Sequence, residues 1–352
     1  MPDRNVALVV GSSGLVGGSI AGHLQGQPGW DVIGVSRRAG ASPAPGWRHE
    51  AIDLLDAAAC ERAAERLGHV THVFYAGRAP GADPAGERAA NAAMLQNLMT
   101  ALEPVATGLR HVSLLHGTKW YGSHLGPYRT PAREDDPRSP QPNFYHDQVD
   151  WLTRRQRGRG WTWSSLRPHI VCGVSVGYPF NLVTTLGAYA GLCRAKRRPM
   201  TFPGTPECWN SVSQATDVGL LARAAAWAAT EPGCAGQSFN IVNADYFRWR
   251  DLWPRLAEAF GVEPGGVESR SLAAEFETDA PLWDAIVRRE RLLPFRLEQV
   301  ANGAFADFLF SAGWDDMSST AKIRRFGFGE VVETEPMFDA MISELRRRRI
   351  AP

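Results

Sequence analysis

The sequence lacks the features that would place the chain in a membrane or on nucleic acid. Its 352 residues carry a net charge of only +1, so no overall field draws the protein to nucleic acid or to an anionic membrane. The N-terminal residues have no apolar signal-peptide core, and the most apolar later stretch, 182–193, is too short to span a bilayer. We therefore predict a cytoplasmic protein with no nucleic-acid or membrane partner.

Cysteine is also scarce and scattered. Five cysteines are odd in number and do not have the spacing of metal ligands. Reduced thiols fit this pattern better than a disulfide framework does, and we expect no metal site.

Apolar strand-like runs alternate with helical patterns along the first half of the chain. Strands are expected at 6–10, 31–36, 50–54, 71–76, 111–115, 163–168 and 238–242, and helices at 19–24, 57–67 and 89–102. This alternation predicts an α/β fold, a doubly wound Rossmann-type parallel sheet. We expect a nucleotide-binding Rossmann domain over 1–173, its sheet completed by segments near 208–245. A smaller, mostly helical substrate-binding region would comprise 174–207 and 246–352.

A glycine triplet follows the first predicted strand. Gly11, Gly14 and Gly17 permit a tight turn and let the backbone approach a pyrophosphate at the N-terminus of the next helix. The alternative is an ordinary strand-to-helix glycine turn, but the strand–loop–helix–strand context favours a dinucleotide site. The loop residues Ser13, Leu15 and Val16 are expected to share in cofactor binding.

The end of the second strand distinguishes between cofactors. An NAD enzyme places an acidic residue there for the ribose 2′-hydroxyl, whereas this chain has Ser36, Arg37 and Arg38. Guanidinium groups match phosphate geometry, so the sequence favours NADPH, unless an arginine merely faces solvent. At the ends of the third and fourth strands, Asp53, Leu54, Tyr75 and Ala76 are expected beside the cofactor.

A lysine is missing where most such oxidoreductases with an acidic tyrosine carry one. Tyr145 opens a predicted helix, but Val149 occupies the position one helical turn later. Lys119 follows the fifth predicted strand, at the sheet edge where a parallel α/β protein places its active site. Either the chain is inactive, or Lys119 and Tyr145 meet in space as a catalytic pair.

Many segments resemble the progesterone 5β-reductase / iridoid synthase family, an atypical branch of the extended short-chain dehydrogenases. The most specific are His116–Gly122 and Asn143–His146, where that family carries its lysine and tyrosine. The resemblance implies that Lys119 and Tyr145 are catalytic and that the glycine loop, Arg37, Arg38 and Asp53 contact the cofactor. Further similar stretches are 11–17, 34–38, 71–75, 91–97, 166–168, 181–183, 239–240, 249–262 and 314–328.

Three departures from the family pattern fall on the substrate side. His146 stands where the family usually has a second tyrosine, and Gly77-Arg78 replaces a common Thr-Trp pair. The loop after Lys119 is also longer, with Ser123-His124-Leu125 inserted. The chemistry implied by the resemblance therefore carries over better than the substrate does.

We predict an NADPH-dependent reductase of activated carbon–carbon double bonds, acting on a small apolar substrate with one carbonyl. Hydride would add to the β-carbon of an enone or enal, and Tyr145 would stabilise the enolate. Pocket walls are expected to include Tyr128, Phe180, Tyr189 and Phe328.

Two other functions remain open from the sequence: direct (1,2) carbonyl reduction or epimerisation, and a non-catalytic NADPH-sensing role. Epimerases normally keep Tyr-x-x-x-Lys and an acidic residue at the second strand, and this chain has neither. The sequence leaves open the physiological substrate, the stereochemistry, a homodimer, and whether the loop 131–142 closes as a lid.

Overall fold

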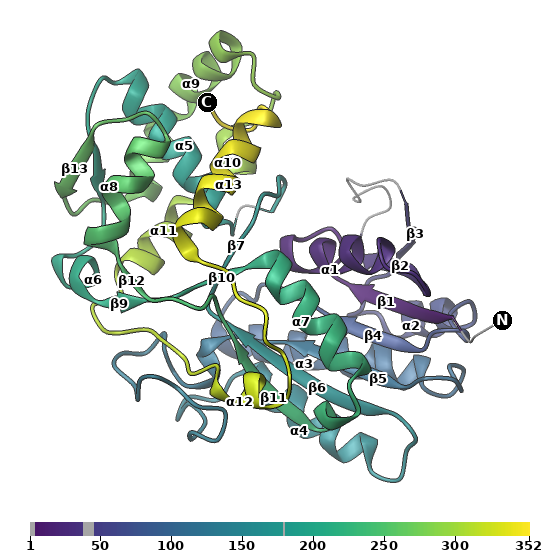
Figure 1. The fold of residues 1–352 in the computed structure, drawn as a ribbon. Coiled ribbons are helices and arrows are strands. Elements are labelled where there is room, and N and C mark those ends of the chain that lie inside the picture. Colours follow the sequence, from purple (N-terminus) through teal and green to yellow (C-terminus); the bar gives the residue numbers. More distant parts are fainter. Residues whose placement is uncertain (1–3, 38–45, 179) are drawn as a thin grey trace.

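A seven-stranded parallel sheet forms the centre of the computed structural model, which describes residues 4–37, 46–178 and 180–352. The strands lie side by side in the order β3-β2-β1-β4-β5-β6-β11 (Figure 1), and every neighbouring pair is parallel. Their bounds are Asn5–Val10 (β1), Trp30–Ser36 (β2), Arg48–Ala51 (β3), His72–Tyr75 (β4), His111–Leu115 (β5), Thr162–Pro168 (β6) and Gln237–Ile241 (β11).

The strand order reverses between β1 and β4. The chain runs outward through β2 and β3 and then crosses back to β4 on the other side of β1. In open parallel sheets the crevice at such a reversal, at the carboxyl ends of the strands, is where ligands bind. The glycine loop after β1 lies at this reversal.

Helices cover both faces of the sheet. One face packs against Leu15–Gln25 (α1) and Val218–Thr230 (α7), through apolar side chains such as Ile20 and Leu221. The other face packs against Ala57–Ala64 (α2), Pro84–Leu102 (α3) and Phe144–Gln156 (α4). The predicted doubly wound Rossmann-type sheet is therefore confirmed.

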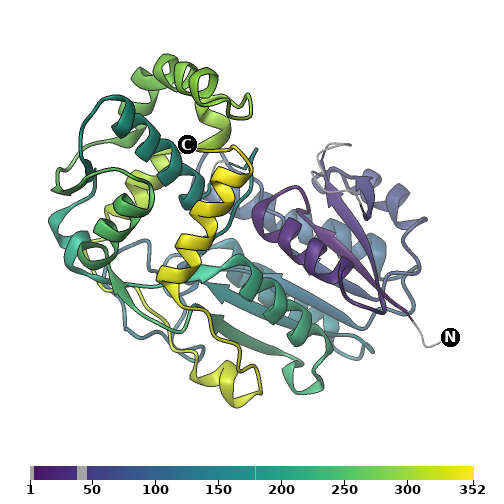
Figure 2. The same cartoon turned by 45° about the horizontal axis from the view of Figure 1, so that its top comes forward.

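A mostly helical region lies beyond the carboxyl edge of the sheet (Figures 1 and 2). Its core is rich in aromatic side chains, among them Trp249, Trp253, Trp283 and Phe310. The helices are Leu182–Ala195 (α5), Pro206–Asn210 (α6), Trp249–Ala259 (α8), Leu272–Glu290 (α9), Leu297–Val300 (α10), Gly303–Phe310 (α11) and Thr334–Arg347 (α13).

Short strands connect this region to the sheet. They form three two-stranded pairs, β7 with β10, β9 with β12 and β8 with β13. Their bounds are Ile170–Cys172 (β7), Met200–Phe202 (β8), Val212–Ser213 (β9), Ala215–Asp217 (β10), Phe247–Arg248 (β12) and Pro264–Val267 (β13). Two short 3₁₀ helices are also present, Thr118–Trp120 (η1) and Pro232–Cys234 (η2).

The chain returns from the helical region to the sheet before its last helix. Ala321–Arg325 (α12), drawn in yellow, lies beside β11 in Figure 1. Just before it, the Ala132 amide donates to the Met317 carbonyl (2.9 Å) and the Ser319 amide donates to the Ala132 carbonyl (2.8 Å). The loop 131–142 is thus tied to this returning segment.

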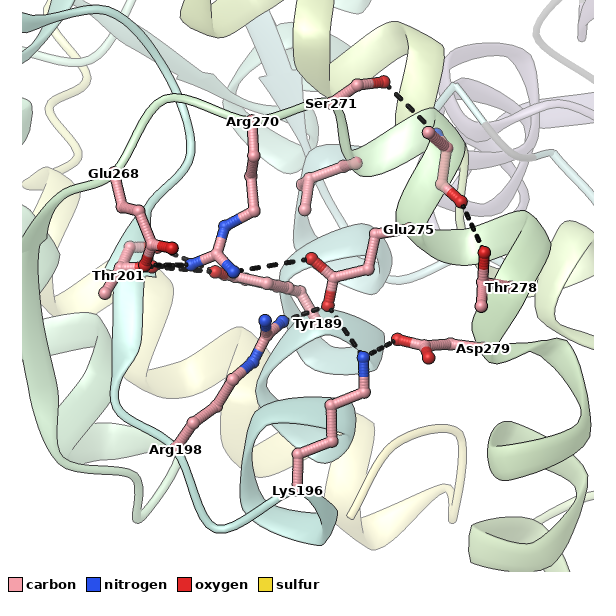
Figure 3. Close-up of polar contacts among 12 residues, drawn as sticks. Tyr189, Lys196, Arg198, Thr201, Glu268, Arg270, Ser271, Glu275, Thr278 and Asp279 are labelled. Atoms are coloured by element: carbon pink, nitrogen blue, oxygen red, sulfur yellow. Dashed lines mark hydrogen bonds and ion pairs between the residues drawn. The ribbon is translucent and has the colours of Figure 1, made fainter.

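An ion-pair network holds α9 against the end of α5 and β8 (Figure 3). Glu275 lies at its centre and pairs with Lys196 (3.3 Å), Arg270 (3.8 Å) and Arg198. Asp279 and Glu268 complete it by pairing with Lys196 and Arg270, respectively. We call these six side chains the α9 network.

Several boundaries differ from the sequence-based expectation. Helix α1 begins at Leu15 rather than at residue 19, because Gly14 already serves as its N-cap. Strand β3 ends at Ala51, and the apolar Ile52 and Leu54 that suggested a longer strand are buried after it has ended. The segment 208–217 does not join the main sheet; of the predicted completing segments only β11 does so.

Within the described ranges, no helix is both long and apolar enough to cross a bilayer. The five cysteines are buried and free. No group of three metal-binding side chains occurs in the part of the chain that the structure describes.

Candidate active site

The glycine loop is packed as closely as backbone allows. Gly11 has a φ of +77°, and a Cβ on it would lie 2.7 Å from the Ala76 carbonyl oxygen. A Cβ on Gly17 would lie 2.3 Å from the Gly11 carbonyl oxygen, so neither position tolerates a side chain. Gly14 caps α1 without a side-chain hydrogen bond, which leaves the N-terminal amides of the helix open to an anion. This geometry fits the pyrophosphate of a dinucleotide.

The other predicted cofactor residues differ in how far their side chains are exposed. Arg37 is exposed at the end of β2, whereas Arg38 lies outside the described residues. Ser36 is half-buried, and its Oγ lies 2.8 Å from His49 Nε2. The Tyr75 side chain is buried in the core between the sheet and α3, so only its backbone can reach a cofactor.

The remaining predicted contacts are also placed by the structure. Asp53 is exposed and its Oδ1 accepts a hydrogen bond from the Leu55 amide (3.0 Å). Leu54 is buried, while the Ala76 carbonyl faces Gly11. Ser13 is half-buried within the loop.

A cavity of about 750 Å³ opens between the carboxyl edge of the sheet and the helical region. Leu15 and Val16 bring the start of α1 to its wall, so the cavity adjoins the glycine loop. Lys119 and Tyr145 both line it, and the structure therefore brings the predicted pair into one site. Most of the remaining wall is apolar.

Asn143 joins the segments that carry the pair. As the N-cap of α4, its Oδ1 accepts a hydrogen bond from the Tyr145 amide (2.9 Å). Its Nδ2 donates to the Lys119 carbonyl (3.1 Å), which ties η1 to the first turn of the helix. One side chain thus sets the spacing between Lys119 and Tyr145.

The Tyr145 ring packs against His116, and its hydroxyl lies over Gly117. The two ring centroids are 4.6 Å apart, and a Cβ on Gly117 would lie 3.5 Å from Tyr145 Oη. His116 is held by Ser165 Oγ (2.9 Å) and Gln148 Oε1 (3.2 Å). Burial lowers the pKa of His116 to about 3, so Tyr145 stacks on a neutral ring.

Electrostatics keep Tyr145 protonated. Burial raises its pKa to about 12, and the positive charge that opposes this shift is that of Arg78. Burial, followed by Arg78, lowers the pKa of Lys119. Within the described chain, Lys119 Nζ makes no hydrogen bond or ion pair and lies 5.8 Å from the Phe308 ring centroid. Its ammonium is thus available to a ligand.

Arg78 is a site residue that the sequence indicated only as a departure from the family. It follows β4 and lines the cavity. Glu87 on α3 holds it through Nε (2.8 Å) and Nη2 (2.5 Å), and its guanidinium lies 5.9 Å from the Phe180 ring centroid.

Among the other departures, Ser123 and His124 of the longer loop line the cavity, whereas His146 fills a structural position. His146 Nε2 lies 3.3 Å from the Trp120 carbonyl, and its ring packs edge-on against Trp120. It is a second connection between α4 and η1. Val149, at the position of the missing lysine, is buried in the core beside the sheet.

Of the four aromatic residues predicted as pocket walls, only Phe180 lines the cavity. Tyr189 is buried in the helical core and its hydroxyl donates to the Thr201 carbonyl (2.9 Å). Phe328 packs against Trp227, on the α7 face of the sheet. Tyr128 lies behind the wall, where its hydroxyl donates to Asp316 Oδ1 (2.5 Å). These three placements were wrong because sequence could not show which face each aromatic side chain would take.

Sequence reasoning also missed most of the opposite wall. Phe305 and Phe308 come from α11, and Trp314 and Asp316 from the segment that follows it. His169, the residue after β6, also contributes. No local motif marks these positions, because they meet the sheet edge only through the packing of the helical region.

The parallel sheet, the glycine loop and a cavity lined by both a tyrosine and a lysine are those of an oxidoreductase of the short-chain dehydrogenase/reductase superfamily that uses a nicotinamide cofactor. A family model described as a PRISE-like Rossmann-fold domain matches residues 48–284. The chain belongs to the progesterone 5β-reductase / iridoid synthase family.

Two relatives cover nearly the whole chain. An (S)-8-oxocitronellyl enol synthase of Catharanthus roseus is 34% identical over 99% of this chain and 93% of its own length. A 3-oxo-Δ4,5-steroid 5β-reductase of Arabidopsis thaliana is 34% identical over 99% of this chain and 94% of its own.

The fold is shared more widely. The crystal structure of a UDP-glucose 4-epimerase from Thermus thermophilus with NAD superposes with a TM-score of 0.69, covering 97% of this chain and 99% of that one. At 19% identity this likeness concerns the fold alone.

Proposed function

We propose that the protein is an NADPH-dependent reductase of carbon–carbon double bonds conjugated to a carbonyl. The observation that carries this proposal is the cavity in which a protonated Tyr145 and the unpaired Lys119 ammonium lie among apolar walls beside the glycine loop. Such a cavity suits an apolar enone or enal whose carbonyl oxygen needs a hydrogen-bond donor.

The side chains would divide the work as follows. Bound NADPH supplies hydride, which adds to the β-carbon of the substrate. Tyr145 donates a hydrogen bond to the carbonyl oxygen and stabilises the negative charge that develops there. Lys119 and Arg78 add positive charge at the same end of the cavity. Solvent or a side chain then protonates the α-carbon.

The names of the two relatives support this chemistry. One is a 5β-reductase of 3-oxo-Δ4,5-steroids, in which the reduced double bond is conjugated to the ketone. The other is an enol synthase, and an enol is what protonation of a stabilised enolate on oxygen gives. Arg37, exposed at the end of β2, supports NADPH over NADH, because a guanidinium matches a 2′-phosphate.

Replacing Tyr145 with phenylalanine tests the proposal. Losing one oxyanion donor typically costs about 100- to 1,000-fold in rate, so kcat for cyclohexenone should fall by that amount while NADPH binding is kept. Tyr246→Phe, at an exposed tyrosine, is the matched control and should leave kcat unchanged. Near-normal turnover in Tyr145→Phe would contradict the assignment.

Product analysis separates this function from its alternatives. A saturated ketone from cyclohexenone supports 1,4-reduction, whereas an allylic alcohol would show direct carbonyl reduction. NADPH binding without oxidation across enones and enals would instead support a sensing role. Repeating the assay with NADH checks the cofactor, and we expect the higher kcat/KM with NADPH.

A further inference from the structure

A carboxylate lies in the cavity wall away from the reacting end. Asp316 belongs to the segment between α11 and α12, and its backbone amide donates to the Val212 carbonyl (2.8 Å), which fixes the segment beside β9. The side chain is about a quarter exposed, at 24%. It is an anion in a cavity that is otherwise mostly apolar.

Two side chains lie behind this carboxylate, of which Tyr128 hydrogen-bonds it, while His169 Nδ1 makes no hydrogen bond within the described chain. The Tyr128 hydroxyl donates to Oδ1 (2.5 Å), and His169 Nδ1 lies 3.4 Å from Oδ2. The His169 side chain is wholly buried, and its Nε2 is bonded to Ser318 Oγ (2.7 Å). Burial raises the pKa of Asp316, but His169 and Tyr128 outweigh it, so the net shift is downward and the carboxylate stays ionised.

The charged groups that act most strongly on Asp316 differ from those that act on Lys119 and Tyr145. The groups that act on the pKa of Asp316 are His169 and Tyr128. Those that act on Lys119 are Arg78 and Glu87, and Tyr145 responds to these two and to Tyr178. Burial, followed by the Asp316 charge, raises the pKa of Cys208, which lines the cavity. Asp316 and the Lys119–Tyr145 pair therefore respond to different sets of charged groups.

The carboxylate needs a hydrogen-bond donor when a bound substrate displaces water from the cavity. A buried charge that loses water without gaining a partner is costly, and Tyr128 and His169 leave further lone pairs of Asp316 free. A cationic donor would meet Arg78 and Lys119 elsewhere in the same cavity. A neutral hydroxyl avoids that repulsion, whereas an anionic group would be repelled by Asp316.

We propose that Asp316, positioned by Tyr128 and His169, accepts a hydrogen bond from a hydroxyl group on the substrate, remote from the carbonyl that Tyr145 binds. The inference rests on the proposed function and narrows its substrate class to enones or enals with a distant hydroxyl. The site selects by distance, because only a substrate of the right length can reach both ends.

Three series of substrates test this with the unmodified enzyme and NADPH. These are trans-2-hexenal, trans-2-octenal and trans-2-decenal, each ending in a methyl, a hydroxyl or a carboxylate group. At one chain length the hydroxyl should raise kcat/KM about 10- to 100-fold over the methyl, as expected for a hydrogen bond to a charged group. The carboxylate should be the poorest substrate at every length.

Variants then assign the effect to one side chain. Asp316→Ala should reduce the hydroxyl-to-methyl ratio to about one, and Asp316→Asn, which keeps an acceptor for Tyr128, should remove the discrimination against the carboxylate. Asp315→Asn is the matched control, because Asp315 bonds the Val212 amide instead and does not line the cavity. It should keep the ratios of the unmodified enzyme.

The outcomes separate this inference from the proposed function. If the enals are reduced but the hydroxyl gives no preference at any length, the Asp316 site is disproved and the reductase assignment stands. If no enal is reduced, calorimetric binding of 1,8-octanediol and 1-octanol decides. If 1,8-octanediol binds more tightly than 1-octanol, and Asp316→Ala abolishes this difference, the Asp316 site is supported and the reductase assignment is disproved. If the diol and the alcohol bind equally well, the Asp316 site is disproved.

Discussion

The sheet half and the helical region bury polar side chains in opposite ways. In the sheet, His111 lies 2.8 Å from both Thr162 Oγ1 and Ser164 Oγ, and burial lowers its pKa to about 3. His72, beside Thr71, has a pKa lowered by burial to about 4. In the helical region, the α9 network instead gathers three cations and three carboxylates near the surface.

This difference shows where ionisable side chains can stay charged and where burial keeps them neutral. Between parallel strands no counter-ion can enter, so ionisable rings stay neutral and pair with hydroxyls. At the edge of α9, partly exposed side chains can pair with opposite charges and retain water. The sheet half should therefore be sensitive to acid and the α9 network to salt, while Lys119 keeps an unpaired charge at the cavity wall.

The largest expected effect comes from removing the unpaired charge of Lys119. Lys119→Met should lower kcat/KM by about 100-fold, because the cavity loses the ammonium that lines it together with Tyr145. Burial and Arg78 lower the pKa of Lys119, so the alkaline fall of kcat/KM in the unmodified enzyme should lie below pH 10.5. In the variant that limb should disappear, since Tyr145 ionises only near its pKa of about 12.

The same substitution in the helical region provides the control. Lys196→Met removes a cation of the α9 network and should leave kcat/KM unchanged while lowering stability. Steady-state kinetics over a pH series, with unfolding curves for both variants, would measure this. If Lys196→Met impaired turnover as much as Lys119→Met, the division between chemistry and stability would be lost.

Next in size is the centre of the α9 network. Glu275→Gln should lower the free energy of unfolding by about 2 kcal/mol at low salt, because three cations lose their shared carboxylate. The difference in unfolding free energy between Glu275→Gln and the unmodified protein should shrink in high salt, because salt already weakens these ion pairs in the unmodified protein. Urea unfolding at two salt concentrations tests it, with Glu277→Gln, exposed on the same helix, as control. An unfolding free energy of Glu275→Gln equal to that of the control would contradict it.

The smallest effect concerns acid. His111 is neutral in the folded state and has an ordinary pKa near 6.5 when unfolded, so its contribution to stability is complete above pH 6.5. It is lost progressively as pH falls from 6.5 toward 3, by about 1 to 2 kcal/mol at pH 5. The free energy of unfolding, measured at pH 7, 6 and 5, should fall less steeply with decreasing pH in His111→Gln than in the unmodified protein. Parallel pH dependence in the two proteins would show that the ring is not buried as a neutral group.

The sequence predicted the residues whose role depends on their own short segment, and it failed for residues whose role depends on tertiary packing. The glycine loop and the strand ends act through their own short segments, so their patterns predicted the fold, and the family resemblance indicated Lys119 and Tyr145, which line one cavity. Tyr128, Tyr189 and Phe328 were chosen only as aromatics in suitable segments, and tertiary packing turned them elsewhere. Asp316 carried no pattern at all, because its neighbours are His169, just after β6, and Tyr128, in the loop before α4.

The return of the chain beside β11 has a consequence for synthesis on the ribosome. A nascent chain that ends before Asp316 already contains the glycine loop, Lys119 and Tyr145. It lacks Met317 and Ser319, whose backbones bond Ala132, and so the loop 131–142 has lost these anchors. We therefore expect the loop 131–142 to take its final position only after the segment that contains Met317 and Ser319 has been translated.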